Sequence, residues 1–398
     1  MKHHMRCLRK TRSKPVWLHT VLVSLVLALG VLGCFRDAEK IPSTDASGVG
    51  KEESGLPPIA MTPLFISMAD ERRGFGLAEA CILRTSDGGA AWTDVTPEIP
   101  DGASIGPAEF LDADTGWFVA SKEDAPSVEV FRTVDGGRTW KGVTLDAGEA
   151  ITGVVSLDFP DAEHGWILLA HGAGMGSEAV SIYKTADGGA SWSLASRTDP
   201  QSSREGGLPF GGIKTGLSFA DHKRGWLTGV DHSDKIWLYE TLDGGETWEK
   251  VRLPVPEGYS TDGGSASTHP PVFFDGQDGF LPVRFGGENP PVTVFYATSD
   301  GGKAWHPTAP VTHAEGKGLL WSFVDPDHGF ALSGDTLYST DDGAKTWTVV
   351  NSVPDLEGTR QLEFVTPKTG WAAGDNEEKA FLLKTVDGGR TWEPAGSE

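Results

Sequence analysis

The sequence predicts an all-β protein, a seven-bladed propeller built from four-stranded antiparallel blades. Three observations predict it: a Gly-rich segment ending in Trp occurs seven times, a Gly-Trp or Gly-Phe pair precedes each copy, and four short strand-like stretches fit within one repeat. The chain has 398 residues with 52 Gly and 14 Trp. This length exceeds one ordinary compact domain of about 100–150 residues and favours a repeat architecture.

The repeated segment has eight residues, with Thr first, Asp third and Trp last. Its copies span 85–92, 133–140, 185–192, 241–248, 298–305, 340–347 and 385–392. The upstream pairs are at 74–75, 116–117, 165–166, 225–226, 279–280, 329–330 and 370–371. Successive Trp residues of the segments are 42 to 57 residues apart, a period typical of one propeller blade per repeat.

The second repeat shows how four strands fit into one unit. Short apolar runs begin near Ala108, Trp117, Val128 and Trp140, with turn-forming residues between them. Four antiparallel strands closed by Gly-rich turns describe a blade. The residues three and two positions before the Thr of the segment are apolar in every copy. We therefore expect the third strand to be covered on both faces, as in a sheet packed between two neighbours.

The Asp of each repeated segment is expected to have a structural role. Its carboxylate can accept hydrogen bonds from amides of its own turn, and the Gly residues that follow tolerate positive φ. The seven residues are Asp87, Asp135, Asp187, Asp243, Asp300, Asp342 and Asp387. Calcium binding is the alternative, but one carboxylate per turn is well short of the about six to eight oxygen ligands that calcium takes. No metal or cofactor is predicted.

The repeated pattern resembles the Asp-box (BNR) repeat. Thr241–Trp248 matches it, and Phe110–Trp117 shows the additional upstream pattern Phe-x5-Gly-Trp. Joined together, the two patterns make the whole unit similar to the Ycf48/Hcf136 family of seven-bladed propellers, from about residue 60 to 396. In the sixth box Ala344 replaces the second Gly. Family members include lumenal assembly factors for photosystem II and can be bacterial lipoproteins, so the resemblance implies a scaffold that assists assembly of a membrane complex.

The N-terminus predicts export and lipid anchoring. Six basic residues precede an apolar run that ends at Gly33, which is the layout of a signal peptide. The run ends in Val-Leu-Gly-Cys34, which resembles the lipobox of bacterial lipoproteins and makes Cys34 the predicted lipidation site. We therefore expect a lipoprotein signal peptide at 1–33, a flexible tether at 34–59 and the propeller at 60–398.

An uncleaved transmembrane anchor is the alternative for this segment, because about 18 apolar residues is the lower limit for spanning a bilayer. Both hypotheses place the propeller outside the cytoplasm, attached to the cell membrane. If Cys34 carries lipid and Cys7 leaves with the signal peptide, Cys81 is the remaining thiol. It lies in a strand-like stretch and is predicted to be a small buried residue rather than a nucleophile.

The charge of the chain argues against nucleic acid as a partner. The formal net charge is -22, and loss of the signal peptide, with six basic and no acidic residues, makes it -28. Such a charge repels a polyanion. We therefore expect a protein or glycan partner, and contact with the membrane through lipid only.

The loops that vary between repeats form the predicted recognition face. Up-and-down strands place the turns after strands one and three at one end of each blade, together with the Asp boxes, and the other loops at the opposite end. Irregular loops on a rigid scaffold commonly carry binding groups. The predicted contact residues are Arg204, Glu205, Phe210, Tyr259, His269, Arg284 and Glu288. The alternative is that these loops, which include 171–179 and 253–271, are only solvated insertions.

A glycoside hydrolase is the alternative function, because Asp boxes also occur in sialidases and in propeller glucanases. That chemistry needs two carboxylates about 5–10 Å apart, or in sialidases a Tyr/Glu pair with three arginines. Glu109, Asp158 and Glu363 occupy equivalent positions in their repeats and could face a central channel. Equivalence by repeat explains them without catalysis, and the sialidase Phe/Tyr-Arg-Ile-Pro segment is absent. The favoured prediction is a non-catalytic scaffold.

Overall fold

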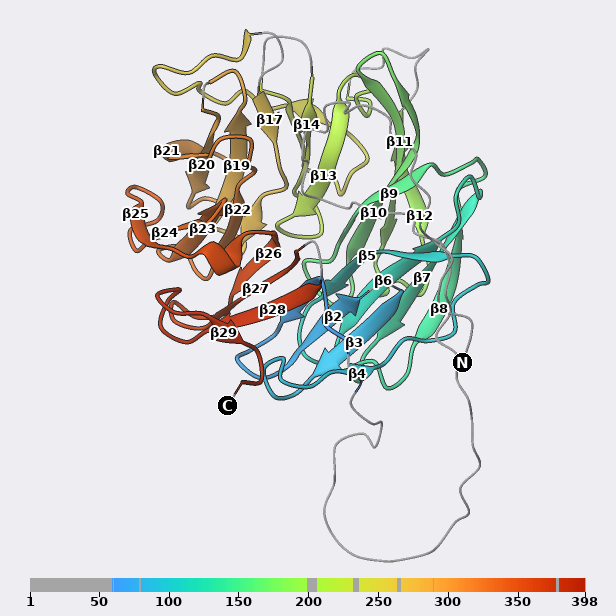
Figure 1. Ribbon diagram of the computed structural model, residues 1–398. Helices are drawn as coiled ribbons and strands as arrows, with labels where there is room; N and C mark the ends of the chain where they lie inside the picture. The colour runs from blue at the N-terminus through green and yellow to red at the C-terminus, as the bar shows by residue number, and fades with distance from the viewer. Residues whose placement is uncertain are drawn as a thin grey trace, which may run out of the picture.

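The computed structural model describes residues 59, 61–78, 80–198, 206–231, 236–262, 266–288, 290–376 and 379–397. These residues form an all-β ring of antiparallel sheets (Figure 1). The predicted fold class is confirmed. The predicted signal peptide, Cys34 and the tether up to residue 58 lie outside the described residues. Within the described ranges, no helix has the length and apolar character needed to cross a membrane.

The strands group in sets of four along the chain, and each set is called a blade below. Five sets are separate four-stranded sheets, and the fourth and fifth sets are joined in one nine-stranded sheet. The extra strand β17 (Ala266–Thr268) makes this junction, because it pairs with the second strands of both blades. The described residues therefore form seven sets, one for each repeat in the sequence.

Each blade contributes one strand to each of four positions. The first strands are β1 (Phe65–Met68), β5 (Ser104–Phe110), β9 (Gly153–Asp158), β13 (Ile213–Phe219), β18 (Val272–Phe273), β22 (Leu320–Phe323) and β26 (Thr359–Phe364). The second strands are β2 (Gly74–Ala78), β6 (Gly116–Ser121), β10 (Gly165–Gly174), β14 (Gly225–Val230), β19 (Gly279–Phe285), β23 (Gly329–Ser333) and β27 (Gly370–Asp375).

The outer two positions complete the blades. The third strands are β3 (Cys81–Thr85), β7 (Ser127–Thr133), β11 (Ser177–Thr185), β15 (Leu238–Thr241), β20 (Val292–Thr298), β24 (Thr336–Thr340) and β28 (Ala380–Thr385). The fourth strands are β4 (Thr93–Asp94), β8 (Lys141–Asp146), β12 (Ser193–Arg197), β16 (Glu249–Lys250), β21 (His306–Thr312), β25 (Thr348–Ser352) and β29 (Glu393–Pro394). A 3₁₀ turn, η2 (Pro354–Leu356), precedes β26. Cys81 is buried, 2% exposed, as predicted.

All seven Asp boxes lie at the same end of the ring. In every blade the amide of the first box Gly donates to a carbonyl in the turn between the first and second strands, as Gly136 does to Asp114 at 2.9 Å and Gly244 to Lys223 at 2.8 Å. Both kinds of turn therefore meet at one end, which we call the box end. The loops after the second and fourth strands lie at the opposite end, which we call the loop end.

Within each box, the Asp side chain holds its own turn together. Asp187 accepts hydrogen bonds from the Thr185 hydroxyl at 2.7 Å and from the Ser191 amide and hydroxyl at 2.8 and 2.6 Å. The Ser191 hydroxyl, followed by these other donors, lowers the pKa of Asp187 to about 2. The following Gly188 has a φ of 69°, which glycine adopts without a Cβ clash. The carboxylate is therefore committed to the turn.

Neighbouring blades pack through aromatic rings that belong to the Phe-x5-Gly-Trp pattern of the repeat. Phe159, after β9, stacks on Trp117 of the preceding blade with ring centroids 3.8 Å apart. Phe219 stacks in the same way on Trp166 at 3.6 Å. Each of these Phe rings also lies flat against the Gly that begins the next strand, so that a Cβ added at Gly165 would meet three atoms of the Phe159 ring. This contact gives the Phe-x5-Gly-Trp pattern its physical reason.

The last blade closes the ring on the first without exchanging a strand, and β26–β29 lie beside β1–β4 (Figure 1). The Gln361 side chain accepts from the Ile66 amide at 2.6 Å and donates to its carbonyl at 2.7 Å. Glu363 accepts from the Met68 amide at 2.9 Å, and the Trp371 indole donates to the Gly88 carbonyl at 2.9 Å. Side chains of blade 7 therefore close the ring.

Candidate functional site

The three equivalent carboxyl groups considered for catalysis hold neighbouring blades together. Glu109 accepts from the Phe159 amide at 2.8 Å, and Asp158 accepts from the Phe219 amide at 2.9 Å. Glu363 makes the same contact to blade 1 at 2.9 Å. Burial raises the pKa of Asp158 to about 7 and that of Glu363 to about 8. Their common role in blade packing is the one that equivalence by repeat predicts.

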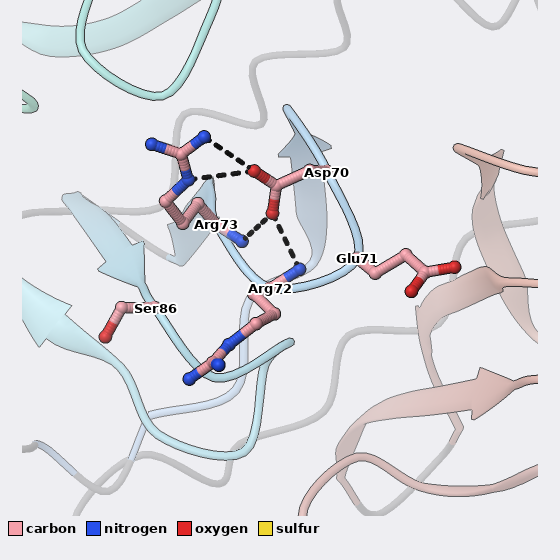
Figure 2. Close-up of a pocket in the computed structure, with 5 residues that line it drawn as sticks. All are labelled: Asp70, Glu71, Arg72, Arg73 and Ser86. Carbon is pink, nitrogen blue, oxygen red and sulfur yellow. Dashed lines mark hydrogen bonds and ion pairs between the residues drawn. The ribbon is translucent and has the colours of Figure 1, made fainter.

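The hollow shown in Figure 2 lies at the box end of blade 1 and has a volume of about 550 Å³. Asp70 accepts hydrogen bonds from the Arg73 guanidinium and from the amides of Arg72 and Arg73, at 2.7 to 2.8 Å. Glu71 accepts from the Thr369 hydroxyl at 2.9 Å. Both acidic groups of the hollow are thus engaged in contacts within the protein, whereas glycoside hydrolysis requires a free pair of carboxylates.

The predicted contact residues that the structure describes lie at the loop end in separate places. Arg204 and Glu205 lie outside the described residues. Phe210 belongs to the loop before β13, Tyr259 to the loop after β16, and Glu288 to the loop between β19 and β20. Among the predicted residues that the structure describes, His269 and Arg284 lie in one cluster, which is described below.

Phe210 contributes mainly through its backbone. Its carbonyl accepts from the Glu178 amide at 3.1 Å and from the Lys214 ammonium at 3.0 Å. Lys214 also donates to the carbonyls of Glu178 and Gly212, both at 3.0 Å. Burial lowers the pKa of Lys214 to about 8, while the Glu178 charge opposes this shift. The Lys214 side chain therefore holds the loop before β13 against the hairpin that β10 and β11 form in blade 3.

That hairpin differs from the sequence prediction. The segment 171–179 was expected to be an irregular loop, but β10 and β11 extend through it as a paired hairpin. The turn at its tip needs positive φ, which Met175 and Gly176 adopt at 53° and 77°. The Met175 side chain is fully exposed. The loop end thus carries a projecting apolar group that the sequence did not single out.

Tyr259 anchors its loop on the body of the propeller. Its ring stacks on Phe285 with centroids 5.4 Å apart, and it packs against the core shared by blades 4 and 5. The ring is half-buried. Its packing is therefore a sufficient reason for an aromatic residue at this position.

Arg284 stands near the loop end of β19, opposite Ser267 on one neighbouring strand and Thr293 on the other. Its guanidinium is half-buried, and burial lowers its pKa. No carboxylate of the described residues lies within 4.0 Å of it, and no described residue forms a hydrogen bond with it. A positive charge is therefore placed partly out of water with no acidic partner in the described part of the chain.

Two buried histidines accompany Arg284. His269 is 7% exposed and His313 is 3% exposed, and in both rings Nδ1 is buried with no hydrogen-bond partner among the described residues. Nε2 of His313 lies 2.9 Å from the Thr293 hydroxyl. Burial, followed by the charge of Arg284, lowers the pKa of both histidines to about 4, with a smaller opposing effect of the Lys317 backbone on His313. Both rings are therefore neutral at pH 7.

We call Arg284, His269 and His313 the loop-end cluster. Trp321 of blade 6 packs edge-on against the His269 ring, with centroids 5.5 Å apart. Sequence reasoning selected Arg284 and His269 but missed His313 and Trp321. Nothing in the sequence marks these two, because their role depends on how blades 5 and 6 meet. Within the described ranges, no group of three or more His, Cys, Asp or Glu side chains is arranged to hold a metal ion.

The chain is similar in sequence to Ycf48 proteins. The family model described as photosynthesis system II assembly factor YCF48 matches residues 195–350. The photosystem II assembly lipoprotein Ycf48 of Synechococcus sp. (strain CC9902) is 26% identical over 352 residues, which cover 78% of this chain and 93% of that protein.

Solved structures show the same fold. The structure described as YCF48 bound to D1 peptide has a TM-score of 0.54 at 18% identity, covering 83% of this chain and 93% of that one. YCF48 from Cyanidioschyzon merolae has a TM-score of 0.50 at 17% identity, covering 82% and 97%. An oligogalacturonate lyase in complex with manganese reaches 0.55 at 11% identity, covering 83% and 89%, so likeness of fold alone does not separate scaffolds from enzymes. The repeated sequence patterns and the sequence similarity together show that this chain is a propeller of Asp-box (BNR) repeats similar to Ycf48 proteins.

Proposed function

We propose that this chain is an extracytoplasmic, lipid-anchored scaffold that binds a protein partner at its loop end and assists the assembly of a membrane complex. The observation that carries the proposal is the loop-end cluster, where a half-buried guanidinium and two buried ring nitrogens have no partner among the described residues. Buried polar groups in folded proteins are almost always paired. An unpaired set at a loop end that includes a half-exposed guanidinium offers groups that a docking partner can reach and complete.

The contacts at the opposite end support this choice of face. There the box carboxylates are bonded to their own turns, and the first Gly amide of each box is bonded to the neighbouring turn. The names of the similar proteins support the class of partner, because one is a photosystem II assembly lipoprotein and one is a YCF48 bound to a D1 peptide. A glycan is the alternative partner for the same face.

Crosslinking in intact cells tests the face. Photo-crosslinking residues placed at Met175 and Val255, which are exposed at the loop end, are expected to capture a specific protein. Matched probes at Val134 and Leu242, which are exposed in the boxes by 61% and 58%, are expected to capture it much less. Stronger capture of the same partner from the boxes would show that the face is wrong, and capture of glycan alone would replace the protein partner.

Lipid anchoring has its own test. Cells grown with a palmitate analogue that can be tagged are expected to label the wild-type chain, and Cys34→Ser should lose essentially all of the label because the acylated sulfur is gone. Cys7→Ser lies within the predicted signal peptide and is the matched control, with labelling unchanged. Equal labelling of Cys34→Ser and wild type, or no labelling of either, would contradict the lipoprotein proposal and favour a transmembrane anchor.

A further inference from the structure

We propose that the loop-end cluster, formed by Arg284, His269 and His313, is a binding site for a carboxylate group. Its residues come from blade 5 and from the segment that follows β17, and Trp321 of blade 6 packs against the His269 ring. Its identification as a place where a partner docks rests on the proposed function, but the chemistry of the site is argued from its own residues.

Arg284 differs from other partly buried arginines of the fold. Arg224, 18% exposed, pairs with Glu240 at 2.9 Å, and Arg132 donates to the carbonyls of Ala162 and Asp187. Arg284 has neither kind of partner among the described residues, although acidic residues outnumber basic ones by 56 to 34 in the chain. Removing a cation from water without pairing it is costly. An arginine kept in this state is suited to receive an anion from outside.

Two imidazole rings, those of His269 and His313, lie within the electrostatic influence of Arg284. Both Nδ1 atoms are buried and have no partner in hydrogen-bond geometry in the described part of the chain, although the Lys317 backbone lies near the His313 ring and raises its pKa against the effect of burial. A neutral imidazole carries one N–H donor and one acceptor. In His313 the Thr293 hydroxyl contacts Nε2 at 2.9 Å, so with the hydroxyl as donor the proton resides on Nδ1. A His269 ring with its proton on Nδ1 also has an N–H donor there, and the charge of Arg284 acts on both rings.

The charge and shape of the cluster select the kind of anion that it can bind. A guanidinium matches a carboxylate with two parallel hydrogen bonds. The cluster carries one positive charge, because burial lowers the pKa of both histidines to about 4 and leaves them neutral. One positive charge balances a monovalent carboxylate. Sulfate and most phosphate groups carry about two negative charges at neutral pH, so that one of these charges would be left unbalanced in a strongly acidic protein. The arrangement therefore favours a carboxylate.

The test is a titration of the full-length protein with sodium acetate at constant ionic strength, followed by ¹⁵N NMR of the imidazole rings. The signals of His269 and His313 are assigned with His269→Gln and His313→Gln variants. We expect both signals to shift and saturate with acetate, and to respond less to sulfate and phosphate. Two further titrations distinguish the source: a peptide with a free C-terminus and no acidic side chain, and an end-capped peptide with one Glu.

Variants separate binding from folding. Arg284→Gln is expected to weaken acetate binding at least tenfold while leaving the denaturation midpoint unchanged or raised, because it removes an unpaired charge. Arg284→Lys should retain part of the affinity, since the charge stays but the two-pronged geometry is lost. Arg72→Gln is the matched control, because Arg72 is an exposed arginine at the box end whose side chain has no partner among the described residues (Figure 2). Its acetate affinity should equal that of wild type.

The proposal is overturned if wild type shows no saturable shift, if Arg284→Gln binds acetate as well as wild type, or if sulfate or phosphate binds more tightly than acetate. A lower midpoint in Arg284→Gln with unchanged histidine signals would mean that the arginine is structural. If acetate binds but loop-end probes capture no partner, the site stands and the proposed function fails. If probes capture a partner but acetate does not bind, only the site fails.

Discussion

Gly165→Ala is expected to destabilise the propeller by about 3 kcal/mol, at the upper end of the usual range for overpacking a core. The added Cβ would collide with the Phe159 ring. That ring cannot move aside, because its other face stacks on Trp117 at 3.8 Å and its edge meets Trp192 at 6.0 Å. The clash must therefore displace β10 from the interface between blades 2 and 3.

Chemical denaturation of the purified protein measures this effect as a fall in the midpoint. Gly153→Ala is the matched control, because Gly153 lies in β9 of the same blade, has no positive φ and has nothing within 4 Å of an added Cβ. It should change the stability by no more than about 1 kcal/mol, in the stabilising direction if the loss of backbone freedom in the unfolded chain dominates. Equal midpoints for Gly165→Ala and wild type would refute the proposed role of the glycine.

The architecture was predictable because each blade repeats the same local chemistry. The box needs Thr, Asp and Gly at fixed spacing to close its turn, and those residues are visible in the sequence whatever surrounds them. The Phe-x5-Gly-Trp pattern was visible in the same way, but its reason was not. The contact of Phe159 with Gly165 and Trp117 spans two blades, and only the three-dimensional structure shows it.

The loop end could be predicted less well, because its loops do not repeat. The projecting hairpin of blade 3 was expected to be a loop, since its Gly-rich sequence lacks the alternation of a strand. His313 gave no signal of its own in the sequence. His313 becomes a candidate site residue only in the folded blade, where its ring contacts Thr293, the residue opposite Arg284 in the sheet. The contact of Trp321 with His269 likewise joins two blades.

The second large effect is expected at the junction that closes the ring. Glu363 accepts the Met68 amide with one oxygen, while its other oxygen, Oε2, is buried with no hydrogen-bond partner among the described residues. Burial raises the pKa of this carboxyl from 4.5 to about 8. The folded protein therefore holds a proton at Glu363 that the unfolded chain has released, over the pH range between these two values.

The difference between the pKa of Glu363 in the folded and in the unfolded protein sets the sign with which stability depends on pH. A carboxyl whose pKa is raised on folding contributes most to stability below pH 4.5, and this contribution is lost as pH rises toward about 8. Glu363→Gln keeps the acceptor for the Met68 amide and cannot ionise. The free energy of unfolding of this variant should therefore exceed that of wild type by a margin that grows with pH, by at most about 1.4 kcal/mol per pH unit.

Denaturation curves at half-unit steps from pH 5 to pH 9 measure this margin, and the difference between the two proteins removes the contributions of Glu109 and Asp158, which both share. Glu393→Gln is the matched control, because Glu393 is exposed on β29 of the same blade. It should follow wild type at every pH. A margin between Glu363→Gln and wild type that stays constant with pH would mean that Glu363 is ionised in the folded ring. The Met68 amide would then be held by a charged group, and closure of the ring would not weaken as the pH rises.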